Sequence, residues 1–517
     1  MNTKITTLRS STALKSSRIK VTLLFIAFCL FLFVFIISLL RIKEVNAAGV
    51  PANWQRGVTL FPQSPTDFAS ANMDLVIQNA RDMNANYITL IIPLQQDTWT
   101  SSTIYKASYA PDDASLIHAI NKAHSLGMKV SLKPHLDPKD NSTWRAQIEP
   151  DDRPKWFSQY SSFLYYYADL AQRNGVAQIV VGSELISMAT FTYCQDKAKP
   201  CENVPENTAR WKEMIAQVRL KFSGLLTYSA NWGGSYFSDE VDHIGFWSDL
   251  DFIGISAYYG LSAYKDPTVS YLMSNWNTVN IERITPVQQR LNKPILFTEI
   301  GYRSVDGATI NPWDWGLQGP YDPQEQSDAV QAMLQYWKEK NYSWFAGFQY
   351  WSWETNPNCS ASGDISYSLQ NKPAYYSMKY GLSGETPVPF TVTSAVDNGI
   401  SQDCNNPKTL SFALQRAGKG DVITLANIPL NNGHPTLEVK GSLPPVNKGV
   451  QLIGNECGAG PSITINGTNA GVGVDGLTLN DNVLLKGLTI TGFSKKQVNI
   501  GKHGIKMQCV KIEKGKF

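Results

Sequence analysis

The chain has 517 residues, which at roughly 150 residues per domain allows two to four domains. Its 46 Lys and Arg residues nearly balance 43 Asp and Glu residues, giving a formal net charge of +3, and this balance argues against a nucleic-acid-binding protein. Hydrophobic residues at 43% and aromatic residues at 11% exclude a largely disordered chain.

The first 40 residues combine a basic segment with a long apolar run. Residues 1–20 carry Lys and Arg but no acid, and residues 21–40 are uncharged and mostly large and apolar. Such a run crosses a bilayer as a helix, with residues 1–20 in the cytoplasm. A cleaved signal peptide is the alternative, because residues 45–47 offer a cleavage site, and a buried core helix is the third. Membrane anchor and signal peptide both predict a protein that works outside the cytoplasm, cell-surface or secreted.

Residues 50–385 alternate short β-prone runs with stretches of helical pattern. Strands that are apolar on both faces are typical of a parallel sheet covered by helices, and eight such units predict an α/β fold, the (β/α)₈ TIM barrel. A doubly wound open sheet is the alternative, but the expected Gly-rich phosphate turn does not follow the first run. The eight runs are residues 56–60, 87–92, 129–134, 178–182, 225–229, 252–256, 294–298 and 345–351.

The helical stretches between these runs are illustrated by residues 113–126. Leu116, Ile117, Ile120 and Ala123 recur there at helical spacing, and Gly127 follows as the expected C-terminal cap. The pattern predicts an amphipathic helix that covers one face of the sheet.

Seven cysteines are too few for a disulfide-built scaffold, and their spacing shows no paired zinc pattern. Cys194 and Cys201 lie seven positions apart in a polar segment. In an oxidising compartment they are candidates for a small disulfide ring, with two free surface thiols as the alternative. The sequence predicts no metal site and no cofactor.

The character of the sequence changes after residues 384–389. From residue 390 to residue 517 aromatic residues are scarce, and short β-prone runs are separated by Gly or Asn turns. This spacing predicts an all-β domain, with a right-handed parallel β-helix favoured over a β-sandwich. The end at Phe517 without a polar cap leaves the last strand edge exposed or the domain incomplete. The runs are residues 422–425, 436–439, 450–453, 462–465, 477–479 and 484–490.

Two glutamates stand at the ends of facing barrel strands. Glu184 follows the fourth run and Glu299 follows the seventh. In this fold the chemistry lies at the carboxyl ends of the strands, and strands four and seven face each other across the barrel mouth. A carboxylate placed after four apolar residues costs desolvation free energy unless it is paired or functional. We therefore expect both carboxylates to meet over one ligand, with a structural ion pair to a neighbouring Arg as the alternative for each.

Hydroxyl-binding and aromatic residues occupy the remaining strand ends. Trp and Tyr rings stack on the C–H faces of sugars, and polar groups between them read hydroxyls. The 14 Trp and 23 Tyr residues suit such a groove. One of the two neighbouring tyrosines is expected to pack inside the barrel, and a structural role is the alternative for the histidine and the last tryptophan. The candidate sugar-binding residues are His135, Ser183, Asn231, Trp232, Tyr258, Tyr259, Trp351 and Trp353.

Several motifs resemble glycoside hydrolases of clan A, and family 113 in particular. They are Arg56–Val58, Val181–Leu185, Tyr228–Trp232, Asp251–Tyr259 and Phe297–Tyr302. The resemblance covers roughly residues 50–383 and implies a retaining β-1,4-mannanase-like enzyme. It also implies that Glu184 is the acid/base and Glu299 the nucleophile. Ser183 stands where many clan A enzymes carry an Asn that binds the sugar 2-hydroxyl, so this contact is expected to differ.

A retaining mechanism requires carboxyl groups about 5–5.5 Å apart and no metal. The expected function is cleavage of a β-linked, mannan-type polysaccharide outside the cytoplasm, with no nucleic-acid partner. A transglycosylase shares every residue named and differs in its products. The alternative from another class is a non-catalytic glycan-binding or cell-surface adhesion protein, which tolerates loss of both glutamates.

Overall fold

The computed structural model describes residues 49–192, 203–233, 239–354, 363–431, 433–458, 462–501 and 503–513. The predicted N-terminal helix and the predicted Cys194–Cys201 disulfide lie outside these residues. Within them, no helix combines the length and apolar character needed to cross a membrane.

Eight parallel strands close into a barrel. Each of these eight strands pairs in parallel with the next barrel strand along the chain, and β9 pairs with β1 to close the ring. The short strand β3 (Tyr105–Lys106) adds to the edge of β2 in antiparallel orientation. All eight predicted runs are barrel strands, so the predicted barrel is confirmed and the open sheet is wrong. The barrel strands are β1 (Gln55–Leu60), β2 (Tyr87–Gln96), β4 (Lys129–Pro138), β5 (Gln178–Ser183), β6 (Leu225–Asn231), β7 (Ile253–Ser256), β8 (Ile295–Ile300) and β9 (Phe345–Trp353).

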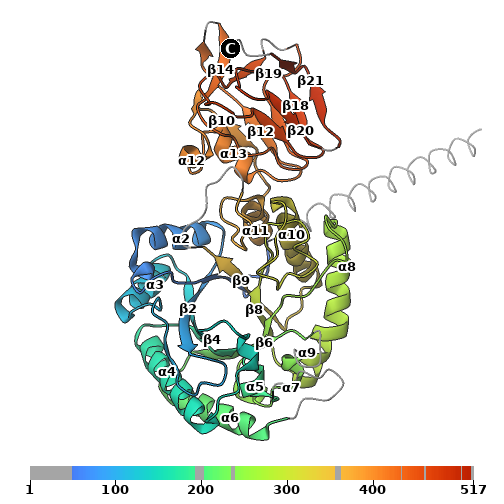
Figure 1. Cartoon of the computed structure of the whole chain (residues 1–517). Helices are drawn as coiled ribbons and strands as arrows, with labels where there is room; N and C mark the ends of the chain where they lie inside the picture. Colours follow the sequence, from blue (N-terminus) through green and yellow to red (C-terminus); the bar gives the residue numbers. More distant parts are fainter. Residues whose placement is uncertain are drawn as a thin grey trace, which may run out of the picture. The chain divides into compact units, whose positions relative to one another are not determined.

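Helices surround the barrel strands (Figure 1). The longer ones are α2 (Ala71–Asp82), α3 (Asp113–Ser125), α4 (Arg153–Arg173), α6 (Pro205–Lys221), α8 (Val269–Val279), α9 (Thr285–Leu291), α10 (Pro323–Lys340) and α11 (Pro373–Ser383). The short turns are α5 (Ile186–Ala189), α7 (Glu240–His243), the 3₁₀ turns η1 (Asp67–Ala69), η2 (Arg145–Gln147) and η3 (Trp247–Asp249), and the π-helical turn η4 (Asn280–Ile284).

The helix α3 shows how the sequence sets these elements. The Asp112 side chain accepts a hydrogen bond from the Ser115 amide at 2.7 Å and caps the first turn. Leu116 and Ile120 are fully buried against the sheet, and Gly127 adopts the left-handed conformation (φ 72°) just past the helix end. The predicted helix and its glycine cap are confirmed.

The barrel interior contains a layer of buried polar side chains. Gln55 donates to Gln178 at 2.8 Å and accepts from Gln349 at 2.9 Å, and Thr89 donates to Gln349 at 3.0 Å. Gly57 faces this layer, and a Cβ there would lie 1.6 Å from the Gln349 Oε1 atom. The glycine is therefore required by the network, which satisfies its buried amides internally.

The strands from β10 onward form stacked parallel sheets around their own hydrophobic cluster. One sheet has the order β10-β12-β15-β18-β21, a second β11-β14-β16-β19-β22, and β17 pairs with β20. These pairings are parallel, so the β-sandwich alternative, which needs antiparallel sheets, is wrong. Two short helices lie between β11 and β12, α12 (Ile400–Asp403) and α13 (Leu410–Arg416).

The strands of this region are short. They are β10 (Phe390–Val392), β11 (Val396–Asp397), β12 (Val422–Leu425), β13 (Leu430–Asn431), β14 (His434–Val439), β15 (Gln451–Ile453), β16 (Ile463–Asn466), β17 (Leu477–Leu479), β18 (Leu484–Lys486), β19 (Leu488–Thr491), β20 (Val498–Ile500), β21 (Lys506–Gln508) and β22 (Lys511–Ile512).

The run predicted as one strand over residues 484–490 is two strands in different sheets. Gly487 separates β18 from β19 with φ 63°, and a Cβ there would lie 1.8 Å from the Asn455 carbonyl oxygen. The apolar pattern continues without a break across Gly487, because residues before and after this turn point into the same core. The single-strand prediction was therefore wrong at the glycine.

A disulfide that the sequence did not predict joins Cys457, after β15, to Cys509, between β21 and β22. The cysteines are 52 residues apart, so the bond closes a long loop of the unfolded chain. We expect the double variant Cys457→Ser/Cys509→Ser to lower the free energy of unfolding of this region by about 2–4 kcal/mol. Denaturant unfolding monitored by circular dichroism measures this. An unchanged transition would contradict a stabilising role for the bond.

Candidate active site

Glu184 and Glu299 lie where two strands break their regular pairing. Between Val180 and Ser183 the strand β5 has one residue more than its partner β6, and β8 has an extra residue opposite Ile255 and Ser256 of β7. Such bulges re-aim side chains and are frequent beside active sites. Both glutamates follow an irregularity of this kind at the carboxyl end of the barrel.

The backbone at Glu184 is held in an uncommon conformation. Its φ is 53°, in the left-handed region, which costs a residue with a side chain about 1 kcal/mol or more. The Glu184 amide donates to the Ser229 carbonyl at 2.8 Å, and the Leu185 amide donates to the Tyr228 hydroxyl at 2.8 Å. The neighbouring strand β6 thus fixes the direction in which the Glu184 carboxyl points.

The Glu184 carboxyl is buried among three donors, two from the turn η2 and its flank and one from the end of β6. Arg145 Nη1 donates to Oε2 at 3.0 Å, Trp144 Nε1 to the same oxygen at 3.3 Å, and Asn231 Nδ2 to Oε1 at 3.5 Å. Burial raises the pKa of this carboxyl, and the negative Glu299 raises it further, while Arg145 lowers it. The net direction is upward, which favours the protonated form of this carboxyl.

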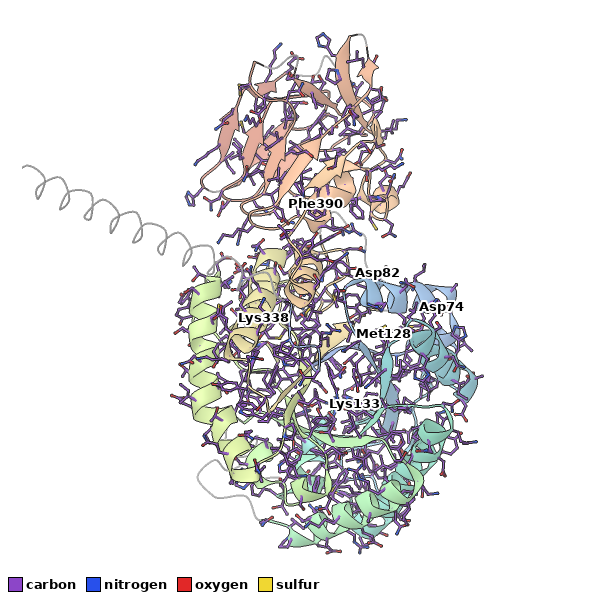
Figure 2. All side chains as sticks on the ribbon, turned by 180° about the vertical axis from the view of Figure 1, so that it is seen from behind. Asp74, Asp82, Met128, Lys133, Lys338 and Phe390 are labelled. Atoms are coloured by element: carbon purple, nitrogen blue, oxygen red, sulfur yellow. A yellow bond between two sulfur atoms is a disulfide. The ribbon has the colours of Figure 1, made fainter. Side chains whose placement is uncertain are left out.

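The Glu299 carboxylate has a different set of donors. Lys133 Nζ bonds Oε1, and the fully buried Lys133 lies within the ring of barrel strands (Figure 2). The Tyr258 hydroxyl donates to Oε2 at 3.0 Å, and Ser183 Oγ donates to Oε1 at 3.4 Å. These contacts orient both oxygens of the carboxylate. The charge of Glu299 also raises the pKa of Glu184, so the two carboxyl groups are close enough to line one site.

His135 and Trp351 form one wall of the same site. Their rings stack at 5.7 Å between centroids, and Phe61 packs edge-on against both at 6.4 Å. Burial, Arg145 and Lys133 lower the pKa of His135 well below its ordinary value, so the ring is neutral. Its Nδ1 atom is buried and has no hydrogen-bond partner among the described residues. A neutral ring nitrogen in this position suits a sugar hydroxyl.

Asn231 and Trp232 border the site at the end of β6. The backbone amide of Asn231 donates to Glu240 Oε2 at 2.7 Å, and the Tyr228 hydroxyl donates to Glu240 Oε1 at 2.6 Å. Burial raises the pKa of Glu240 to about 8. The Asn231 Oδ1 atom is buried and unpartnered among the described residues. Trp232 is partly exposed, and its ring lies 6.1 Å from that of Tyr258.

Two predicted sugar-binding residues lie in the core instead. Tyr259 packs against Trp276 at 6.1 Å, on the opposite face of the chain from Tyr258, as expected for one of two adjacent residues. Trp353 is buried, and its indole donates to the Val76 carbonyl of α2 at 3.1 Å. Both residues therefore have the structural surroundings that the sequence offered as the alternative for them, and a sugar-binding role for Tyr259 and Trp353 stays a prediction.

Three contacts of the site were missed from the sequence. Lys133 was visible as a lone charge inside an apolar strand, which is itself a signal for a functional or paired group. Trp144 and Arg145 lie on and beside the turn η2, which follows β4, and Arg145 also forms a salt bridge with Asp137 at 2.9 Å. Their approach to Glu184 depends on the path of that loop, which carries no periodic signal.

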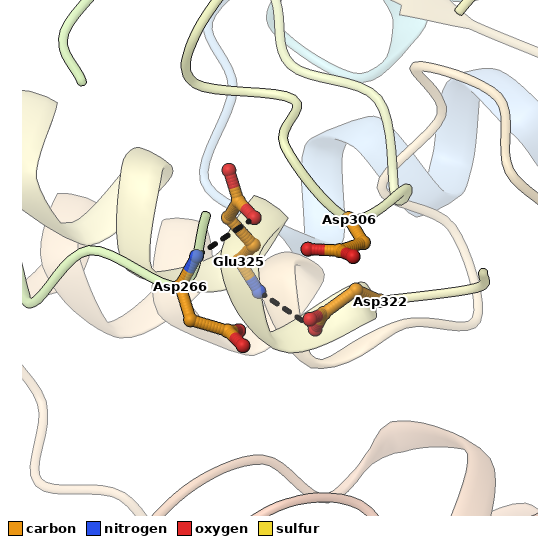
Figure 3. Close-up of side chains that lie close together, drawn as sticks. All are labelled: Asp266, Asp306, Asp322 and Glu325. Carbon is orange, nitrogen blue, oxygen red and sulfur yellow. Dashed lines mark hydrogen bonds between the residues drawn. The ribbon is translucent and has the colours of Figure 1, made fainter. Parts of the chain in front are cut away.

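A second group of acids lies apart from this site, within the part of the chain that the structure describes. Single carboxylate oxygens of Asp266, Asp306, Asp322 and Glu325 lie within 4.8 Å of one another (Figure 3). Lys448 Nζ bonds Asp266 and Asp322, and Lys265 pairs with Asp306 at 2.9 Å. Protein ammonium groups thus provide the counter-charge that a cation would otherwise supply.

A closed parallel barrel with two buried carboxyl groups at the carboxyl ends of its strands is the arrangement that barrel glycoside hydrolases use. The model of Glycoside Hydrolase Family 113 matches residues 61–372, and the chain belongs to this family. It is a glycoside hydrolase of the β-mannanase family.

Solved structures of the family are similar to this chain. A GH113 β-1,4-mannanase solved as a complex is 27% identical, covering 65% of this chain and 100% of that one with a TM-score of 0.54. A further GH113 β-1,4-mannanase structure is 27% identical, with coverages of 64% and 99% and a TM-score of 0.53. A GH113 β-mannanase from Alicyclobacillus acidocaldarius in complex with ManMIm is 25% identical, with coverages of 65% and 97% and a TM-score of 0.52. A comparison with curated proteins gives no match.

Proposed function

We propose that this protein is an exported, retaining hydrolase of β-1,4-linked mannan in which Glu184 is the acid/base and Glu299 the nucleophile. The observation that carries the assignment is the contrast between the donor sets of the two carboxyls. Glu184 is buried and its pKa is raised, as a proton donor requires. Glu299 is oriented by Lys133 and Tyr258, as an attacking group requires.

In the first step a Glu299 oxygen attacks the anomeric carbon while the glycosidic C–O bond breaks. Glu184 gives its proton to the leaving oxygen, and a glycosyl ester with Glu299 forms. In the second step water attacks the anomeric carbon from the side that the leaving group left. Glu184 takes a proton from this water, and Glu299 leaves as carboxylate. The Tyr258 hydroxyl and Lys133 Nζ stabilise the negative charge that returns to Glu299.

Trp351, His135 and Asn231 are the residues we assign to the reacting sugar ring. The Trp351 ring supplies a face for the sugar C–H groups. His135 Nδ1 and Asn231 Oδ1 are buried polar atoms without a partner among the described residues, and hydroxyl groups of the sugar would satisfy both. Ser183 donates to Glu299 rather than reaching outward, so the 2-hydroxyl contact falls to Asn231 in this proposal.

Export is supported by the basic and apolar segments before residue 48 and by the Cys457–Cys509 disulfide. Cys457–Cys509 is a bond of the kind that persists in oxidising compartments. We further propose residues 50–385 as the catalytic domain and residues 390–517 as a separate domain. Apart from β13, which pairs antiparallel with β14, successive strands of the latter fall in turn into two longer parallel sheets and a third parallel pair, β17 and β20, which supports coils of a right-handed parallel β-helix.

A substrate panel tests the proposed function. The purified protein is incubated with mannan, glucomannan, xylan and β-glucan, and products are analysed by mass spectrometry. We expect shorter oligosaccharides from mannan and glucomannan. In a further incubation with a mannooligosaccharide, products longer than this substrate would indicate a transglycosylase instead. Cleavage of xylan or β-glucan with mannan untouched would contradict the substrate assignment.

Arg145 is expected to set the alkaline limit of the reaction. Activity requires protonated Glu184, so kcat/KM falls as pH rises through the pKa of this carboxyl. Because Arg145 lowers that pKa, Arg145→Gln should move the alkaline limb to higher pH. The measurement is the pH profile of kcat/KM on a mannooligosaccharide, whose sugar leaving group needs a proton from Glu184, with Arg210→Gln, a surface ion-pair residue, as control. A limb that stays in place or moves to lower pH would refute the role of Arg145.

A further inference from the structure

Two exposed tryptophans lie on the loop between β8 and α10. Trp313 is 50% exposed and Trp315 is 83% exposed, although large aromatic side chains are normally buried extensively. They are two positions apart, and the partly exposed Asp314 lies between them. Exposed aromatic surface of this kind marks a binding site more often than chance.

The loop that carries them is firmly anchored. The buried Arg303 guanidinium donates to the carbonyl of Trp315 at 2.7 Å and also to that of Leu317, and its Nε donates to the Ile365 carbonyl at 3.0 Å. The buried Glu325 carboxylate accepts from the Gly307 amide at 2.8 Å and from the Thr309 amide at 2.9 Å. A fixed loop presents its side chains with little loss of conformational entropy on binding.

A short chain of contacts joins this loop to the catalytic carboxylate. The Tyr367 hydroxyl donates to the carbonyl of Pro312, next to Trp313, at 2.7 Å. The Tyr367 ring lies 6.3 Å from that of Tyr258, whose hydroxyl donates to Glu299 at 3.0 Å. The loop also follows β8, the strand of Glu299, so it belongs to the carboxyl end of the barrel.

We propose that Trp313 and Trp315 form an aromatic platform that binds sugar rings of a β-linked polysaccharide beyond the ring that is cleaved. The inference rests on the proposed function and adds a binding site outside the catalytic residues. Flat indole faces suit pyranose C–H surfaces, and Asp314 between them supplies an acceptor for hydroxyls. A protein partner fits less well, because two side chains are far smaller than the roughly 1,200 Å² or more that stable protein interfaces bury.

The test compares long and short substrates in the full-length protein. For Trp313→Ala/Trp315→Ala we expect kcat/KM on glucomannan to fall about tenfold, while kcat/KM on an aryl β-mannoside stays unchanged. The double variant Trp313→Tyr/Trp315→Tyr, which keeps an aromatic face, should recover most of the loss. Tyr166→Ala, which removes an exposed aromatic ring from α4, is the control and should behave as wild type on both substrates.

Binding is measured separately by affinity electrophoresis in gels that contain mannan, glucomannan, xylan or β-glucan. We expect the wild type to be retarded by at least one polysaccharide and Trp313→Ala/Trp315→Ala to migrate faster in that gel. Equal retardation of both, no retardation of the wild type, or an equal fall on long and short substrates would overturn the platform. If the wild type cleaves no mannan but its retardation still depends on the tryptophans, the proposed function fails and the platform stands.

Discussion

Glu299→Gln should lower kcat on glucomannan by at least about 10⁴-fold, because no other group can form the glycosyl ester. Gln keeps the size of the side chain and an acceptor for the buried Lys133. Glu299→Ala would leave that ammonium group unpaired, at a cost of about 3–5 kcal/mol in stability. Gln is therefore the better variant for separating chemistry from folding, and initial rates on glucomannan measure the effect.

Two controls accompany this variant. Glu339→Gln makes the same chemical change at an exposed position of α10 and should leave the rate unchanged. Thermal unfolding and affinity electrophoresis on glucomannan should show that Glu299→Gln still folds and binds polysaccharide. A folded Glu299→Gln protein with wild-type turnover would exclude Glu299 as nucleophile.

Glu184→Ala should slow glucomannan hydrolysis by roughly 10²–10⁴-fold, since the leaving oxygen then departs without a proton. An aryl β-mannoside with a good leaving group needs little help in this first step, so the glycosyl ester should accumulate. Azide should then attack the ester in place of activated water and raise turnover. The product should be a β-glycosyl azide, with the configuration of the substrate, identified by NMR.

The configuration of the azide product separates the two glutamates. With Glu299 replaced by Ala, azide can attack the substrate only directly, which gives the α-glycosyl azide. Glu206→Ala, at an exposed position of α6, is the control and should show no azide effect. An α-azide from Glu184→Ala, or no rescue at all, would contradict its assignment as acid/base.

The barrel was predictable because its strands are continuous apolar runs. A parallel sheet that is covered on both faces requires such runs, since both faces of each strand are buried. The positions of Glu184 and Glu299 followed from the same logic, since a carboxyl after such a run lies at the strand end. The sequence could not place Arg145, because its contact with Glu184 depends on the conformation of the loop after β4. The contact of Lys133 with Glu299 was not predicted either, because the two residues are 166 positions apart in the chain.

The burial of Trp353 and the break in the strand predicted over residues 484–490 have local causes. Trp351 and Trp353 are two apart and would share a face on a regular strand. Between Tyr350 and Trp353, however, β9 has one residue more than β1, so the two side chains point in different directions. At residues 484–490 a single left-handed glycine turns the chain from one sheet to the other. Neither irregularity alters the hydrophobic pattern, so neither was visible in it.

The anomeric configuration of the first product tests the account most directly. Proton NMR during the first minutes of mannooligosaccharide hydrolysis distinguishes a retained from an inverted reducing end before mutarotation mixes them. The two-glutamate double displacement predicts that the β-anomer forms first. If the α-anomer appeared first, water would have attacked the sugar directly, and Glu299 would not be the nucleophile.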